Sequence, residues 1–471
     1  MRSFASRLVL ASWASCVLLV TAETSLPAAE ITDVTSSAEK GHPFGFRIAA
    51  SYSHLEKRAA IQREIEVAGA DDIRAFKDLR YTQRRDTLNL RAEIGLFRDL
   101  MVYGGLPLVL SDSRELRYDQ SLGAGCVFPG DPNSAPTCVN AGNSSTVADG
   151  ILPASGFDAR AGGAAIPGGS SLVFRGPRRG GSGTDLLDTV NVGITWAVFN
   201  QKRDDTKPTW TLNFEAQISI GNLMRFDRAN PDANHGVSEG LHRLVARTAI
   251  SKRFRYFDPY IGFWYLFPTP RKDTLFLNYG PAQQSQRAQQ KAGTVFGVEL
   301  IPLDLQRKSV KLALQFQGRI EGRFEGRGYS EIWEILAGAG PLACNPAQNP
   351  ACSTNNNPIS NPYQGGQPYT GITTIQDHAV VGADFSLILQ AGKWVRLGAQ
   401  FQYTREQGHL ATIDGVGQAL DTNCQKPTDG PVTRPCEFNP AYRPVINQVG
   451  RRYRIDDIDL YNVGGWAQFI F

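Results

Sequence analysis

The chain contains 471 residues and carries 49 basic against 45 acidic side chains, so its formal net charge is only +4. These charges are spread along the chain, which excludes the clustered basic surface expected of a nucleic-acid-binding protein. The mean hydropathy is −0.26, and no stretch approaches the roughly 18 uninterrupted apolar residues that indicate a transmembrane helix.

The N-terminus has the features of an export signal. Arg2 and Arg7 form a positive region, and the apolar run Leu8–Val20 follows them. Small residues at the end of this run suit signal peptidase. We therefore predict a cleaved signal peptide over residues 1–22 and a mature chain that begins at Glu23.

Residues 23–42 follow as a short polar lead-in, which is too small to be a plug domain of the kind that fills receptor-type transporters. From residue 43 to the C-terminus, apolar and polar residues alternate with a period of two, in segments of about 10 residues. In one segment Trp210 and Phe214 share a face and Glu215 lies on the other. The clearest segments lie at about 44–53, 88–96, 190–198, 210–220, 310–317 and 395–403. Weaker segments lie at about 101–110, 242–252, 259–267, 291–301, 379–389 and 459–471, which makes 12 predicted strands.

The connections between these segments alternate between short and long. Brief turns such as 97–99, 201–207 and 391–393 follow even-numbered strands, whereas long loops follow odd-numbered ones, and the largest spans about 111–188. This asymmetry is typical of membrane barrels and is not expected of a soluble β-sandwich or propeller. We therefore predict an all-β fold: a single transmembrane antiparallel β-barrel of about 12 strands over residues 43–471, with short periplasmic turns and long extracellular loops.

Five tryptophans lie near the predicted periplasmic ends of the strands: Trp196, Trp210, Trp264, Trp394 and Trp466. Tryptophan suits the membrane interface, so we expect these residues in an aromatic girdle. Trp394 and Trp466 have the opposite parity to the apolar faces of their neighbours. An inward orientation is the alternative for those two.

The chain ends inside an alternating strand. Tyr461, Gly465, Phe469 and the terminal Phe471 share one face of it. This ending resembles the C-terminal signal that the barrel-assembly machinery recognises in Gram-negative outer-membrane β-barrel proteins. The motif covers about a dozen residues and its glycines are one place off the commonest spacing, while the architectural resemblance covers the whole mature chain. The resemblance implies assembly by that machinery, location in the outer membrane, and contact with its lipid and lipopolysaccharide.

Six cysteines fall in the predicted long loops, in three local pairs. The pairs are Cys126 with Cys138, Cys344 with Cys352, and Cys424 with Cys436. In an oxidising compartment this pattern predicts three disulfides, one within each loop. CxxC and His-rich spacings are lacking, so we expect no metal site and no cofactor.

By the same alternation, ten charged side chains are predicted to line the barrel interior. They are Arg91, Glu93, Glu215, Arg243, Arg247, Glu299, Lys311, Arg319, Glu321 and Arg396. With Arg47 and Asp384 they make seven basic and five acidic groups. One interpretation is a network in which opposite charges pair and partly fill the lumen, since unpaired interior charge is costly. The other is a narrow aqueous path with basic walls that mildly favours anions.

Residues 330–336 predict a short helix in a long loop, with Ser330 as its cap. Its apolar residues Ile332, Trp333, Ile335 and Leu336 must be buried. They pack either against their own loop or into the barrel mouth as a constriction.

Asp377 and His378 adjoin a strand start, and an Asp–His pair at a barrel rim is similar to that of the omptin proteases. Adjacent strand residues point to opposite faces, so we expect no catalytic site and no enzymatic activity. Our first functional hypothesis is a porin-like passive channel for small hydrophilic solutes. The alternative is a closed barrel that presents disulfide-linked surface loops for adhesion or recognition.

Overall fold

The structure is a computed structural model. It describes residues 29–38, 44–66, 72–120, 139–152, 157–158, 171–226, 234–278, 285, 287–305, 308–339, 369–415, 439 and 441–471. The predicted signal peptide and the six cysteines of the predicted disulfides lie outside the described residues, so both stay predictions.

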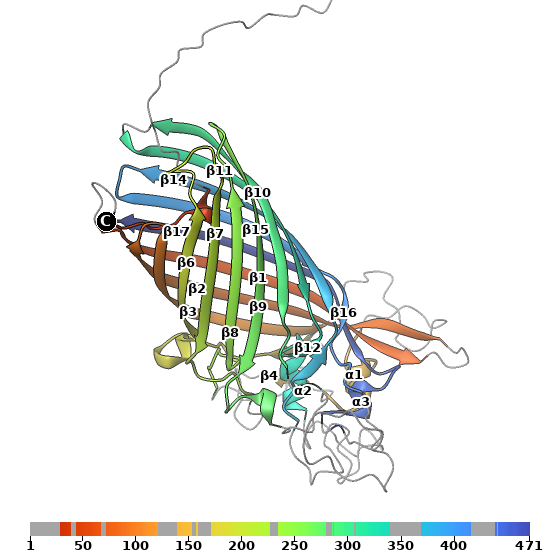
Figure 1. The fold of residues 1–471 in the computed structure, drawn as a ribbon. Coiled ribbons are helices and arrows are strands. Elements are labelled where there is room, and N and C mark those ends of the chain that lie inside the picture. Colours follow the sequence, from red (N-terminus) through yellow and green to blue (C-terminus); the bar gives the residue numbers. More distant parts are fainter. Residues whose placement is uncertain are drawn as a thin grey trace, which may run out of the picture.

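The described strands form a closed antiparallel barrel of 12 strands, which confirms the predicted fold (Figure 1). They are β1 (Phe46–Glu66), β2 (Ile73–Phe97), β3 (Leu100–Tyr118), β6 (Thr189–Phe199), β7 (Thr209–Ser219), β8 (Leu241–Ser251), β9 (Phe257–Pro270), β10 (Lys291–Leu305), β11 (Val310–Arg323), β14 (His378–Ala391), β15 (Val395–Glu406) and β17 (Tyr453–Ile470). Each pairs with its neighbour in the chain order, and β1 pairs with β17 from Arg47↔Ile470 onward to close the barrel. Closure leaves no unpaired strand edge within the membrane, where unsatisfied backbone groups would be costly.

The remaining elements are short. The further strands are β4 (Phe157–Asp158), β5 (Leu172–Arg175), β12 (Gly326–Gly328), β13 (Thr373–Ile375) and β16 (His409–Leu410). The helices are η1 (Glu30–Thr32), α1 (Ser145–Ala148), η4 (Gly183–Leu186), η6 (Leu275–Leu277), α2 (Trp333–Gly338) and α3 (Pro444–Asn447). No helix in the described part of the chain has the length and apolar character needed to cross a membrane.

The alternation seen in the sequence separates the two faces of the barrel wall. On β7, Phe214 is 59% exposed and Ile218 is also exposed, whereas Glu215 and Ser219, which have the opposite parity, are buried. Similar bulky apolar residues are exposed on the outside of the other strands. Such a belt would be an aggregation hazard in water but is the expected lipid contact of an outer-membrane barrel.

β1 and β2 are much longer than the alternation predicted. Their pairing continues past the other strands to Glu66↔Ile73, and the hairpin projects beyond the barrel wall (Figure 1). Outside the lipid, the outer face no longer needs apolar residues, so the alternation fades although the backbone hydrogen bonds continue. β3 likewise runs on to Tyr118, into the stretch predicted as a loop.

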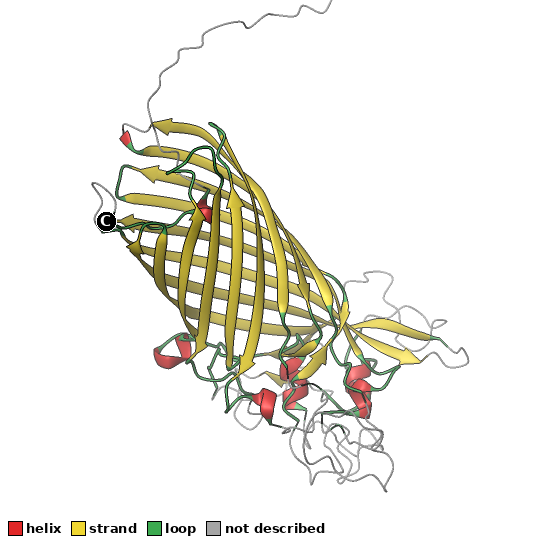
Figure 2. Ribbon diagram, in the orientation of Figure 1, coloured by secondary structure: helices red, strands yellow, loops and turns green. Residues whose placement is uncertain are grey.

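The described parts of the long loops lie at one end of the barrel, opposite the short turns and the C-terminus (Figures 1 and 2). There they share a hydrophobic core with the extended strand ends. It includes Ile61, Leu79 and Leu116 from β1–β3 and buried residues of the loops that carry α1, α2 and α3. The described parts of these loops therefore pack together as an extracellular cap.

Candidate functional site in the barrel interior

In the described part of the chain, a cavity lies in each half of the barrel interior. One, of ≈ 630 Å³, is lined by residues near the short-turn ends of the strands, such as Arg47, Tyr103 and Gln468, so it lies in the periplasmic half. The other, of ≈ 430 Å³, is lined by residues near the long-loop ends, such as Arg243 and Arg323, so it lies in the extracellular half. Charged side chains line both cavities.

A charged and aromatic cluster forms one wall of the periplasmic cavity. Tyr103 donates a hydrogen bond from its hydroxyl to Glu215 Oε2 at 2.6 Å, and Arg247 Nη1 lies 3.1 Å from the same oxygen. The Arg91 guanidinium stacks over the Tyr103 ring at 3.7 Å and pairs with Glu93 at 2.8 Å. Each charge therefore has an opposite charge or an aromatic face beside it, as burial requires.

The structure places all ten charged residues predicted for the lumen on the inner side of the wall, and each forms an ion pair. The pairs not described above are Arg243 with Glu239, Lys311 with Glu299, Arg319 with Asp384, Glu321 with Arg323, and Arg396 with Glu30 and Asp33, at N–O distances from 2.7 to 3.6 Å. This arrangement corresponds to the network interpretation of the lumen charges. That these residues line a conducting path stays a prediction.

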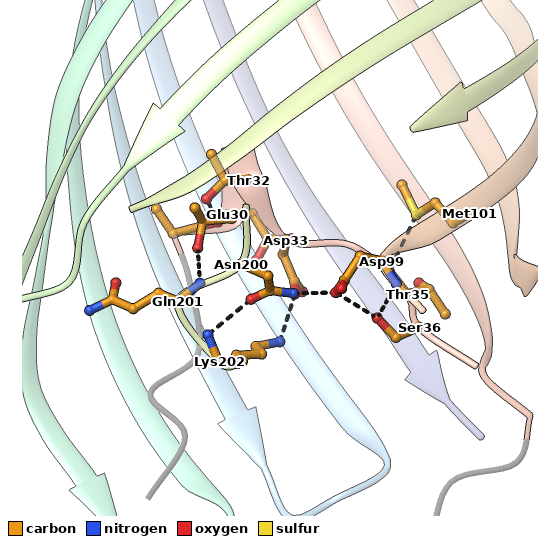
Figure 3. Close-up of polar contacts among 12 residues, drawn as sticks. Glu30, Thr32, Asp33, Thr35, Ser36, Asp99, Met101, Asn200, Gln201 and Lys202 are labelled. Carbon is orange, nitrogen blue, oxygen red and sulfur yellow. Dashed lines mark hydrogen bonds and ion pairs between the residues drawn. The ribbon is translucent and has the colours of Figure 1, made fainter. Parts of the chain in front are cut away.

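Residues 29–38, expected only as a lead-in, lie across the periplasmic end of the lumen (Figure 3). The Glu30 amide donates to Glu299 on β10, and the Thr32 hydroxyl bonds Ser251 on β8 at 2.7 Å. The Thr35 hydroxyl donates to Glu93 on β2 at 3.0 Å. Since these partners come from widely separated strands, the segment spans the opening and does not follow one wall.

Asp33 is the centre of the contacts that hold this segment. Its carboxylate lies 2.9 Å from Arg47, 3.1 Å from Arg396 and 3.2 Å from Lys202. Burial raises the pKa of Asp33, but the three cations more than offset this and hold the pKa well below its usual value. Asp33 is therefore ionised in its docked position at neutral pH.

Sequence reasoning missed this role of Glu30 and Asp33, although a signal was present. The predicted lumen set has seven basic and five acidic groups, an excess that barrel burial disfavours. Glu30 and Asp33 supply the two missing carboxylates, and Arg396 contacts both. The excess of basic groups in the predicted lumen, together with the acidic residues of the lead-in, could have indicated this contact.

At the other end, α2 packs into the capped mouth. Trp333 has no exposed surface and shares a cluster with Leu241 of β8 and Phe276 of η6. Ile335 and Leu336 pack in the core built on the ends of β1–β3. Residues 330–336 therefore combine the two sequence alternatives. They pack at the barrel mouth and also against their own loop, where Trp333 Nε1 donates to the Thr370 carbonyl at 3.1 Å. The helix begins at Trp333 with Ile332 at its N-cap, so the predicted Ser330 cap was wrong.

The five tryptophans do not form one girdle. Trp196 is exposed on the outer face, Trp210 shares the outward parity of β7, and Trp394 is exposed in the turn between β14 and β15. Trp466 points inward, as its parity allowed, but Trp264 does so as well, and both line the periplasmic cavity. The girdle prediction was therefore wrong for Trp264, whose position in β9 has the parity of the lumen residues.

His378, the first residue of β14, packs against a histidine of β16. The His378 ring stacks on that of His409 at 3.7 Å, and its Nδ1 lies 2.9 Å from the Gln376 carbonyl. Among the described residues, no group of three or more His, Cys, Asp or Glu side chains is placed to hold a metal ion.

Comparison with known proteins finds likeness at the level of the fold only. No protein-family model matches the chain, and no curated protein sequence matches it. Among solved structures, the chain is similar to the COG4313 outer membrane channel from Pseudomonas putida F1, at 10% identity and a TM-score of 0.35, with 93% of this chain and 100% of that chain covered. The chain is also similar to a Pseudomonas aeruginosa FadL homologue, at 8% identity and a TM-score of 0.28, with 91% of this chain and 90% of that chain covered. For the Escherichia coli outer membrane protease OmpT the sequence identity is 5% and the TM-score is 0.27, with 93% of this chain and 100% of that chain covered. Channels and a protease thus occur together, and these likenesses carry no functional argument.

Proposed function

We propose that the protein is an outer-membrane channel that passes small hydrophilic solutes through the barrel lumen, without a catalytic step. The observation that carries this proposal is the space beside charged side chains in the lumen, ≈ 630 Å³ in the periplasmic half and ≈ 430 Å³ in the extracellular half. A barrel that served only as a scaffold could fill its interior with packed side chains, as small barrels do. Charged, water-accommodating cavities instead suit the passage of polar solutes.

Different structural elements lie at the two ends of this route. Residues 29–38 cross the periplasmic opening, held mainly through polar contacts with lumen side chains. The extracellular cap is held by a hydrophobic core. Because polar contacts can be exchanged for water more readily than apolar burial, the N-terminal segment is the element we expect to move during passage.

The test is ion conductance of the refolded full chain in a planar bilayer, with a salt gradient to measure selectivity. Discrete, reproducible openings are expected. A barrel that migrates as folded and heat-modifiable in gels but gives no openings would contradict the proposal.

The alternative function, a scaffold that presents surface loops for recognition, has one observation in its favour. The loops carrying α1, α2 and α3 pack into one core, and such a rigid surface could hold a binding epitope. The double variant Arg243→Glu with Arg247→Glu separates the two functions. A channel should shift its ion preference towards cations, whereas a scaffold should change only in stability. Lys207→Glu, in an exposed periplasmic turn, is the matched control and should leave the preference unchanged.

A further inference from the structure

The extracellular cavity has a distinctly basic wall. Seven basic and two acidic side chains line it. The carboxylates that pair with most of these bases, such as Asp112 behind Arg85 and Glu406 behind Arg323, do not line the cavity themselves. The bases therefore stand between the cavity and their partners, and the surface offered to a solute is positive.

Lys291, at the start of β10, is the exception to the pairing. Among the described residues, no carboxylate oxygen lies within 4.0 Å of its ammonium group and no hydrogen bond to it is formed, while Lys57 and Arg243 on the same wall are both paired. Lys291 is half-buried beside the cavity. A cation in that position needs an anion or water to replace its lost solvation.

The residue directly opposite Lys291 adds to this need. Lys291 is the register partner of Arg323 on β11, so two cations face each other across adjacent strands. Like charges in that relation repel and destabilise the sheet. Arg323 is held by Glu321 at 2.8 Å and by Glu406 at 3.0 Å. Lys291 has no such direct partner, because Glu321 and Glu239 act on it only from beyond ion-pair distance.

Two further groups on the wall lack partners. Gln289 Nε2 and Ser330 Oγ are buried, line the cavity and make no hydrogen bond within the described structure. Both groups can donate a hydrogen bond. Buried donors are normally satisfied. Both atoms have almost no exposed surface, so each side chain must rotate towards the cavity before it can donate to an acceptor there.

The same wall also carries apolar residues, and Leu266 is the register partner of Lys291 on the adjacent strand β9. Leu266 and Pro268 of β9, with Phe276 of η6, line the same cavity. A ligand that satisfies the whole wall combines a negatively charged group that accepts hydrogen bonds with a small apolar body.

We propose that this cavity is a binding site for a small organic oxyanion, whose charged end lies at Lys291 and whose apolar body contacts Leu266, Pro268 and Phe276. The charged end is a carboxylate or a phosphate, since both present oxygens to ammonium, amide and hydroxyl donors. The inference deepens the proposed channel function by naming a solute class, and in that sense rests on it. The binding itself requires no conduction.

The experiment is isothermal titration calorimetry on the folded full chain in detergent, with benzoate, inorganic phosphate and the uncharged analogue benzamide as probes. Benzoate should bind and benzamide should not. If phosphate binds and benzoate does not, the oxyanion site stands and its charged end is a phosphate. Failure of both anions to bind the folded protein, or equal binding of benzamide, would overturn the proposal.

Variants test the role of Lys291. Lys291→Met keeps the aliphatic stem and removes the charge, so anion affinity should fall at least about tenfold, as expected for one charge-assisted contact. Without ligand this variant should be at least as stable as the wild type, because the repulsion by Arg323 is removed, and Lys291→Gln serves as a second neutral variant. Lys207→Met, in the exposed periplasmic turn, is the control and should bind normally. Undiminished affinity in both Lys291 variants would overturn the assignment.

The binding proposal and the channel proposal can be contradicted separately. Lys291-dependent binding by a barrel that gives no openings in a bilayer would leave the site intact and remove the channel. Channel openings from a protein that binds neither anion would support the channel and overturn the binding site.

Discussion

At the residue scale, the lumen wall is shaped by aromatic rings that lie over glycines. Tyr103, Trp264 and Trp466 each face a glycine as direct register partner on the adjacent strand, namely Gly193, Gly293 and Gly398. Any Cβ at these glycines would lie within 2.8 Å of the ring atoms. The missing side chain lets each ring lie flat against the wall, which keeps the lumen open beside it.

This arrangement predicts the effect of Gly193→Val. A Cβ there would lie 2.3 Å from Tyr103 Cζ, so the ring must leave its position and its hydrogen bond to Glu215. We expect a destabilisation of about 1–3 kcal/mol, measured by urea unfolding in detergent or lipid. Gly104→Val is the matched control, because a Cβ at Gly104 meets only the Asn191 carbonyl, at 4.0 Å. Equal stability of the two variants would contradict this account.

Asp33 allows a second prediction at this scale. Asp33→Asn removes the charge that holds Arg47, Arg396 and Lys202, so residues 29–38 should dock less tightly. We expect hydrogen-exchange protection of the amides in this segment, such as Ser37, to fall about tenfold or more. Asp204→Asn, in an exposed turn, is the control and should leave the protection unchanged.

The pKa of Asp33 sets the pH range of this docking. Since the pKa is lower in the docked state than the ordinary 3.8, the stabilisation is fully present above that ordinary value and is lost as pH falls through the lower, docked value. Protection factors of the segment should therefore be constant from about pH 5 to 8. A loss of protection between pH 7 and 5 would show that another group controls docking.

The sequence predicted which face of the barrel wall a side chain lies on, but not which side chains contact each other. Alternation alone placed Arg91, Glu215 and Arg396 on the inner side, because parity is a local property of a strand. It could not show that Tyr103 donates to Glu215 or that Arg396 contacts Asp33, since these residues are 112 and 363 positions apart in the chain. Such pairs follow from the closure of the barrel.

At the element scale, the same limit applies to segments that leave the wall. Strand existence was predicted correctly, but the extension of β1 and β2 to Glu66 and Ile73 was not, because outside the lipid the pattern no longer alternates. The position of residues 29–38 inside the lumen was also missed. A segment held by cross-lumen ion pairs has no periodicity of its own to detect.

Removal of residues 29–38 gives a prediction at the scale of this element. A chain lacking residues 29–38 should still fold, because β1 and β17 close the barrel through their own ladder. Its unit conductance in a planar bilayer should rise at least about twofold, since the segment occupies the periplasmic opening and conductance follows the open cross-section. Replacement of residues 201–207 in the periplasmic turn by a Gly/Ser turn of equal length is the control for a change at the same end. Unchanged conductance in the deletion would show that the constriction lies elsewhere.

At the scale of the whole molecule, the lumen charge is shared between the wall and the N-terminal segment. The wall contributes an excess of two basic groups in the predicted set, and Glu30 and Asp33 offset it from within the lumen. Ion selectivity in such a pore depends on the sum of these charges and not on any one of them. The periplasmic half of the intact lumen should therefore add little discrimination between small anions and cations, and any anion preference should come from the basic wall of the extracellular cavity.

This charge distribution predicts how selectivity changes when the segment is altered. Glu30→Gln with Asp33→Asn removes both carboxylates while the chain length is kept, and should shift the reversal potential in a salt gradient towards anions. The chain lacking residues 29–38 should shift in the same direction and also conduct more, because it loses both the charge and the obstruction. Adding Arg396→Gln and Arg47→Gln to the charge-neutralised segment should return the potential towards that of the wild type, since two wall cations are then removed. A shift in the deletion variant without one in the charge variant would mean that the segment acts by its bulk, and selectivity would then have to arise in the extracellular half of the lumen, where Lys291 lies.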